Sequence, residues 1–159
     1  MLTLEGLEEQ LGPDHPRTLI LADNLGVLLM NREQWGEAEQ LLRRALTGNT
    51  RILGPSHPYT LWSLAGLGRL LRDSNRPHEA EPLLREALER REQVLGPTHA
   101  NTLWSALDLG LLLGKAGDHS GAEALLRRAY EGNTALFGPN HPETLQAGQA
   151  LDNLLKSET

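Results

Sequence analysis

One short phrase, built on Gly-Pro-x-His, returns at a fixed interval of 42 residues along this chain of 159 residues. The phrase reads LGPDHP from Leu11, LGPSHP from Leu53, LGPTHA from Leu95 and FGPNHP from Phe137. A fixed period of this kind is typical of stacked repeat proteins, in which each unit buries its apolar face against its neighbours. Because such proteins present an extended surface, the repeat favours a binding function over catalysis.

The period divides a single domain, residues 1–159, into repeats over 11–52, 53–94 and 95–136 and a partial repeat over 137–159. Residues 1–10 align with the last ten residues of a full repeat, so we expect them to end a preceding helix B, the second helix of a repeat. The positions that are identical in all four repeats are, in the first, Gly12, Pro13, His15, Thr18, Leu19, Leu25, Leu28 and Leu29.

The first helix of each repeat, helix A, is expected to begin at about residues 15, 57, 99 and 141. A residue type that caps helix N-termini well stands just before each of these points. These candidate caps are Asp14, Ser56, Thr98 and Asn140. A proline in the first turn follows in three repeats, where its missing N–H costs little. The preceding Gly-Pro ends the helix before it.

Apolar residues then recur at helical spacing in two stretches of each repeat, which predicts a helix A followed by a helix B. The sequence therefore predicts an all-α fold of about eight antiparallel helices: a half repeat, three full repeats and a half repeat. The pairs Gly48-Asn49 and Gly132-Asn133 lie late in helix B and are poor helix formers, so we expect fraying or a tighter turn there.

Composition excludes several classes of function. The net charge is −6, which argues against a nucleic-acid binder that relies on a general positive field. The chain has no cysteine and hence neither a disulfide nor a cysteine-based metal site. No stretch is long and apolar enough to span a membrane, and the N-terminus does not resemble a targeting peptide, which favours the cytoplasm.

Nothing in the motifs predicts catalysis, a cofactor or a bound metal, so we expect a protein that is not an enzyme. His15, His57, His99 and His141 recur once per repeat, too far apart to ligate one metal ion. The basic residues of helix B follow glutamates at i, i+4 spacing, which favours local ion pairs. A phosphate-binding strip is the alternative for Arg43, Arg44, Arg127 and Arg128.

The string NREQWGEAEQLLRRAL, followed by LGPSHPYTL, resembles the kinesin-light-chain-like class of tetratricopeptide repeats (TPRs). The positions typical of tetratricopeptide repeats also match, namely Leu25, Gly26, Leu29, Ala38, Leu42 and Ala45. The resemblance covers essentially the whole chain. It implies a right-handed superhelical solenoid in which A helices line a concave groove that binds proteins or peptides.

By this resemblance, five positions of each helix A line the groove. In the first two repeats they are Ile20, Asp23, Val27, Met30 and Asn31, and Trp62, Ala65, Arg69, Arg72 and Asp73. In the last two they are Trp104, Leu107, Leu111, Gly114 and Lys115, and Gln146, Gln149, Asn153, Lys156 and Ser157. The basic points of this set could attract acidic residues of a ligand.

Two features of these positions concern the ligand. Trp62 and Trp104 occupy the same repeat position, so at the helix spacing of about 10 Å they form either a shelf for an extended peptide or part of the core. Related repeats carry an asparagine pair that clamps the peptide backbone, and only Asp23-Asn24 approximates it. A more apolar ligand or a flat partner surface fits the middle repeats better.

The sequence thus predicts a scaffold or adaptor that binds a peptide or protein in the groove, with no nucleic acid and no membrane as partner. The alternative is a structural subunit, or a fragment of a larger assembly, that docks on neighbouring subunits through its ends or its convex face.

Overall fold

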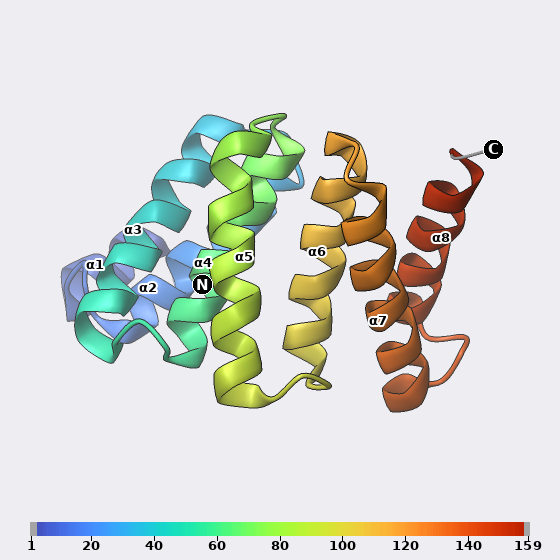
Figure 1. Ribbon diagram of the computed structural model, residues 1–159. Coiled ribbons are helices and arrows are strands. Elements are labelled where there is room, and N and C mark those ends of the chain that lie inside the picture. The colour runs from blue at the N-terminus through green and yellow to red at the C-terminus, as the bar shows by residue number, and fades with distance from the viewer. Residues whose placement is uncertain (1–2, 158–159) are drawn as a thin grey trace. The chain divides into compact units, whose positions relative to one another are not determined.

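The computed structural model describes residues 3–157, and helices are the regular elements of this part of the chain (Figure 1). They are α1 (Leu4–Leu11), α2 (Pro16–Met30), α3 (Trp35–Leu53), α4 (Pro58–Asp73), α5 (Pro77–Leu95), α6 (Ala100–Ala116), α7 (His119–Phe137) and α8 (Pro142–Lys156). The predicted all-α repeat fold of eight helices is confirmed. No helix among residues 3–157 combines the length and the apolar character that a membrane span requires.

The helices form two compact units, Met1–Leu83 and Leu84–Thr159, which meet within the sequence of α5. In the first unit, α1 packs on α2, α2 on α3 and α3 on α4, while the A helices α2 and α4 also contact each other. The repeated apolar positions form its core, as Leu19, Ala22, Ala38 and Leu42 are each fully buried.

The second unit repeats this arrangement with α6, α7 and α8, which lie side by side in Figure 1. Helix α7 packs between α6 and α8, and the two A helices of the unit touch each other. Its core uses the same repeat positions as the first unit, since Leu103, Ala106, Ala122 and Leu126 are buried.

The A helices are capped by the repeated histidines and not by the residues before them, which corrects the predicted caps Asp14, Ser56, Thr98 and Asn140. Each histidine is the extended N-cap residue, and its Nδ1 atom accepts from the backbone N–H two residues later. In the first repeat that distance, from Arg17 N to His15 Nδ1, is 3.2 Å. The residue before a proline prefers extended backbone, which favours the later cap in three repeats, and His99, which precedes Ala100, is an extended cap as well.

The identical glycine and threonine of the repeat close the turn between helices. Gly12 has a φ of +92°, a left-handed conformation that favours glycine. Its carbonyl accepts from Thr18 Oγ1 at 2.9 Å, and the same bond joins Thr60 to Gly54 at 2.8 Å. The repeated phrase thus encodes both a helix stop and a helix start.

Gly48 and Gly132 do not fray helix B, contrary to expectation, because α3 and α7 continue beyond them to Leu53 and Phe137. A Cβ atom added at Gly48 would lie 2.7 Å from both Cδ atoms of the buried Leu19. One at Gly132 would lie 2.6 Å from those of Leu103. These glycines therefore admit the leucine of the preceding helix A, and the packing gain outweighs their low helix propensity.

Candidate functional site

The A helices of the first unit place the predicted groove residues at different depths. Ile20, Val27, Trp62, Arg69 and Arg72 are half-buried, and Asn24 is exposed. Asp23, which we expected on the groove surface, is instead buried with 2% of its surface exposed. Among the predicted groove residues of this unit, the half-buried ones and Asn24 are therefore those that a ligand can reach.

Asp23 belongs to a buried polar chain that joins three helices. Its Oδ2 atom accepts from Ser63 Oγ at 2.6 Å, and Ser63 Oγ in turn accepts from Asn49 Nδ2 at 3.0 Å. Burial raises the pKa of Asp23 to about 7, although the bond from Ser63 opposes that rise. These bonds link α2, α3 and α4, so the role of the buried polar chain is to hold the three helices in position.

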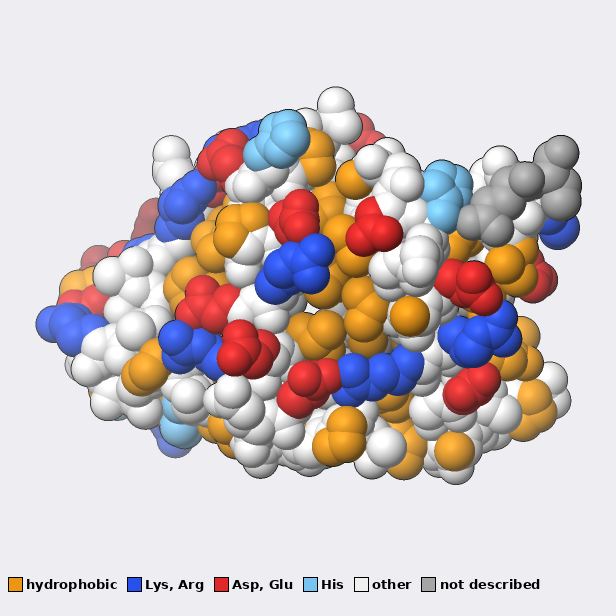
Figure 2. Space-filling model, viewed as in Figure 1, with side chains coloured by type: hydrophobic (Ala, Val, Ile, Leu, Met, Phe, Trp, Pro, Cys, Tyr) orange, Lys and Arg blue, Asp and Glu red, His pale blue; other side chains and the backbone are white. Residues whose placement is uncertain are grey.

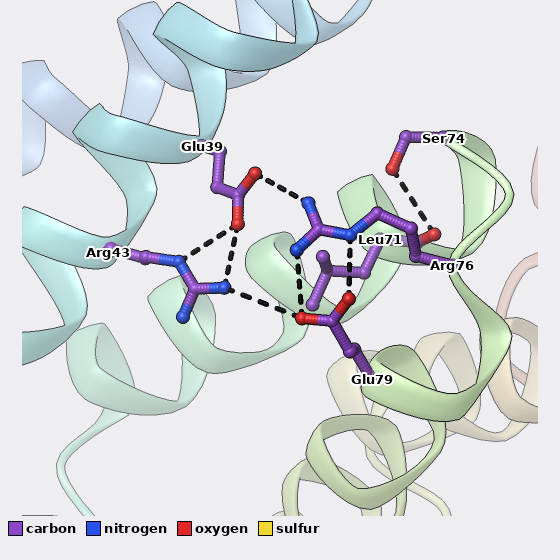
Figure 3. A network of polar contacts seen from close by, with 6 residues as sticks. All are labelled: Glu39, Arg43, Leu71, Ser74, Arg76 and Glu79. Carbon is purple, nitrogen blue, oxygen red and sulfur yellow. Dashed lines mark hydrogen bonds and ion pairs between the residues drawn. The ribbon is translucent and has the colours of Figure 1, made fainter.

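An exposed network of charges ties α3 to the start of α5 within the same unit (Figure 3). Arg76 donates to Glu39 at 2.6 Å and makes two bonds of 2.8 Å to Glu79. Arg43 also donates to Glu39, at 2.7 Å. The bonds from Arg76, and then those from Arg43, lower the pKa of Glu39, so its carboxylate is the centre of the network.

The arginines of α3 and α7 form ion pairs rather than an unpaired positive strip. Arg43 and Arg127 pair at the predicted i, i+4 spacing, whereas Arg44 and Arg51 pair with acidic residues distant in the sequence. Figure 2 shows basic and acidic side chains beside one another over α3 and α7. Arg127 bonds to Glu123 at 2.7 Å, Arg44 to Glu8 at 2.5 Å and Arg51 to Asp14 at 2.5 Å. A hollow of about 410 Å³ beside α3 is lined by Asp14, Arg43, Arg44, Thr47, Gly48 and Arg51. Since these arginines already have acidic partners, the hollow offers little unpaired positive charge.

In the second unit, the structure brings five of the predicted groove positions together. They line a hollow of about 210 Å³ between α6 and α8. The five are Leu111, Gly114, Lys115, Asn153 and Ser157. Four further residues that we did not predict complete the lining, namely Gly110, Leu126, Ala150 and Leu154. These four residues are small or apolar, so in the sequence nothing distinguishes them from ordinary residues of a helix core.

The other predicted residues of this unit lie outside the hollow. Trp104 is half-buried and Gln149 is exposed, whereas Leu107 is buried and forms part of the core, which corrects its expected place on the groove surface. Gln149 is connected to the hollow indirectly, since its Nε2 atom donates to Asn153 Oδ1 at 2.9 Å. Trp62 in the first unit and Trp104 in the second are thus each half-buried.

A metal centre is not found in the part of the chain that the structure describes. Among residues 3–157, no group of three or more histidine, aspartate or glutamate side chains is placed to hold a metal ion. The repeated histidines use Nδ1 for capping. The hollow that gathers predicted residues is lined by apolar side chains and by Lys115, Asn153 and Ser157.

Comparisons with known proteins agree with this architecture. A family model described as tetratricopeptide repeat matches residues 18–93 and 76–135. A search of curated protein sequences found no significant match. Among solved structures, a putative kinesin light chain of Podosopora anserina with nearly identical TPR-like repeats aligns with a TM-score of 0.82 at 23% identity. BtubC (BKLC) from P. vanneervenii aligns with a TM-score of 0.79 at 18% identity.

Both alignments cover 91% of this chain, which spans 68% of the kinesin light chain structure and 58% of BtubC. At these identities the likeness concerns the fold. It confirms that the repeats resemble those of kinesin-light-chain-like proteins in architecture.

Proposed function

The chain belongs to the tetratricopeptide repeat family, and we propose that it is a non-enzymatic scaffold or adaptor that binds a peptide or protein surface on its A helices. Repeats of this family generally mediate protein–protein interaction. In the proposal, the accessible faces of α2 and α4 in one unit and of α6 and α8 in the other contact the partner.

One observation carries the proposal: the hollow between α6 and α8, where five positions expected from the repeat pattern meet around an apolar floor. Binding surfaces of proteins combine a desolvated apolar centre with a polar rim that hydrogen-bonds the partner. Here the rim residues Lys115, Asn153 and Ser157 are exposed, whereas Leu126 and Leu154 at the floor are buried.

The half-buried indoles of Trp62 and Trp104 are the proposed anchors outside the hollow. Tryptophan is enriched among the residues that dominate binding free energy, because it buries a large area at a small cost in conformational entropy. Arg69 and Lys115 would orient a ligand by charge, whereas Arg72 already pairs with Asp73 at 2.9 Å.

The test is affinity capture of partners from a lysate with the wild type and a Trp62→Ala/Trp104→Ala double variant. Tyr59→Ala is the matched control, because Tyr59 is an exposed aromatic residue of α4 outside the proposed groove positions. Circular dichroism checks that each variant is folded. A partner that the control retains and the double variant loses supports the proposal, and a partner that folded forms of both retain contradicts it.

A second candidate, docking on a neighbouring subunit, is supported by one face of α8. Leu145 is 57% exposed, whereas Leu19 and Leu103, at the same repeat position, are 0% and 1% exposed because a following helix B covers them. A helix from a neighbouring subunit could cover Leu145 in the same way. If so, sedimentation velocity of the purified chain with that subunit will show a complex that Leu145→Ser weakens.

A further inference from the structure

We infer that the hollow between α6 and α8 is a specificity pocket that takes one aliphatic side chain of a bound peptide, next to an acidic residue of that peptide. The inference rests on the proposed function and adds to it the chemistry of the ligand at one subsite.

The floor of the hollow fits one apolar side chain. Leu111, Leu126, Ala150 and Leu154 supply its apolar lining, and its volume is about 210 Å³. An apolar cavity of about 150 Å³ is enough to bind benzene, so this volume accommodates a side chain of the size of leucine. Small-molecule sites more often have about 300–1,000 Å³ and enclose their ligand, so an open hollow of this size suits a peptide side chain better.

Gly114 is the residue that creates the hollow. The same repeat position holds Met30 in the first repeat, Arg72 in the second and Lys156 in the fourth. Met30 is only 4% exposed, so its side chain fills space within the first unit, whereas Gly114 has no side chain at the corresponding position. A Cβ atom at Gly114 would lie 3.2 Å from Leu154 Cδ1, inside the lining of the hollow.

The neighbouring Gly110 has a different purpose. A Cβ atom there would lie 2.9 Å from Leu126 Cγ and Cδ2, so this glycine allows α6 and α7 to pack closely. Gly110 therefore serves the fold, while Gly114 sets the size of the side chain that can enter.

The rim favours an acidic residue in the ligand. Lys115 is the one charged residue among those that line the hollow, and it is exposed. Asn153 Oδ1 already accepts from Gln149, which leaves the N–H groups of the Asn153 amide to donate. A carboxylate beside the aliphatic side chain would meet an ammonium group and an amide donor, with no acidic residue in the lining to repel it.

The experiment is a titration of the uniformly ¹⁵N-labelled full chain, followed by NMR, with capped peptides. The probe is acetyl-Gly-Leu-Glu-Gly-amide, and its matched forms replace Leu by Ala or Glu by Gln. We expect the probe to shift the amide signals of Gly110, Gly114 and Leu154. The Ala form should bind about tenfold more weakly, because it leaves the apolar floor unfilled. The Gln form should lose affinity mainly at low salt.

Gly114→Met tests the pocket in the protein, because it introduces the side chain that Met30 has in the first repeat. We expect this variant to lose the preference for Leu over Ala. Gly36→Met is the matched control, since Gly36 lies in α3 with nothing within 4 Å of an added Cβ atom. Gly114→Ala is the milder variant, because its methyl group would contact only Leu154 Cδ1 and Ala122 Cβ. We expect it to fold and to bind the Leu probe several-fold more weakly.

Equal binding of the Leu and Ala probes, or unchanged binding by a folded Gly114→Ala or Gly114→Met variant, would overturn the inference. Those results are distinct from failure of the proposed function. Suppose that the wild type and Gly114→Met both capture a partner that the Trp62→Ala/Trp104→Ala variant loses. The scaffold proposal would then hold, and only the pocket would be excluded.

Discussion

The two units differ at one buried repeat position, which holds the neutral Asn49 in the first unit and the charged Arg91 in the second. In the first unit, Asn49 donates to Ser63 at 3.0 Å, and Ser63 donates to the buried carboxyl group of Asp23. In the second unit, Arg91 takes the place of the asparagine and donates to Ser105 at 2.9 Å and to the carbonyl of Asn101 at 2.8 Å. The repeat thus fixes which positions meet, while the individual side chain decides which charge is buried.

Burial shifts the pKa values of the two buried charged groups, Arg91 and Asp23, in opposite directions. Arg91 is 3% exposed, and burial lowers the pKa of its guanidinium group to about 10, while the charge of Asp108 partly offsets the effect. Arg91 therefore stays charged at neutral pH. Asp23, by contrast, has its pKa raised to about 7 and changes its charge in the physiological range. We expect the first unit to be the pH-sensitive one.

The largest effect is expected from Arg91→Met. The substitution leaves the Asn101 carbonyl and the Ser105 hydroxyl without their buried donor and removes the cation near Asp108, so we expect a loss of about 4 kcal/mol in the free energy of unfolding. Urea unfolding followed by circular dichroism measures it. The control is Arg127→Met, which removes the exposed i, i+4 partner of Glu123 and should cost far less. Equal losses in both variants would show that Arg91 is no more than a surface residue.

Asp23→Asn should stabilise the protein by about 2 kcal/mol at pH 8, because the buried negative charge is removed. The pKa of Asp23 is raised in the folded state, from 3.8 to about 7. Its contribution to stability is therefore fully present below pH 4 and lost as the pH rises through 7. Accordingly, urea unfolding should show the gain over the wild type shrinking as the pH falls from 8 to 4. A gain independent of pH would contradict the assigned burial.

Ser63→Ala should cost about 1 kcal/mol, because both Asn49 and Asp23 lose their shared partner. Ser105→Ala should cost less, since Arg91 keeps its bond to the Asn101 carbonyl. Ser63→Ala should also raise the pKa of Asp23 further, because it removes the bond that lowers that pKa. Carbon-13 NMR of the aspartate carboxyl groups measures the shift, and an unchanged pKa would argue against the bond.

The smallest effect is expected at the surface, from Glu39→Gln. It disrupts the network with Arg43 and Arg76 and should cost about 0.5 kcal/mol at low salt and less at high salt. Glu123→Gln, which loses one arginine partner, is the comparison for the second unit. If the loss at Glu39 did not depend on salt, the network would not act through charge.

Local chemistry made much of the fold predictable. The spacing of the repeat, the prolines of the first turn and the glycines at helix ends placed all eight helices, because these signals act between residues close in the chain. The caps were misplaced by one residue, since in all four repeats the histidine side chain, and not a residue such as Asp14, accepts from a backbone N–H of the first turn.

The candidate site was predictable only in part. The resemblance supplied Leu111, Lys115 and Asn153, which the structure brings around one hollow. It also placed Asp23 and Leu107 on the surface, where the structure buries them. A repeat position fixes the direction of a side chain from its helix, but its depth depends on the size of the residues facing it from the neighbouring helix.

The sequence by itself determined that this chain is an array of helix pairs, because a period of 42 residues with fixed turn signals has few other structural solutions. Only the tertiary structure decided that Gly48 admits Leu19, that Asn49 finds Ser63, and that Gly114 opens a hollow beside Leu154. The physical reason is that these contacts join side chains of different helices. Their distances follow from close packing, which no single stretch of sequence specifies.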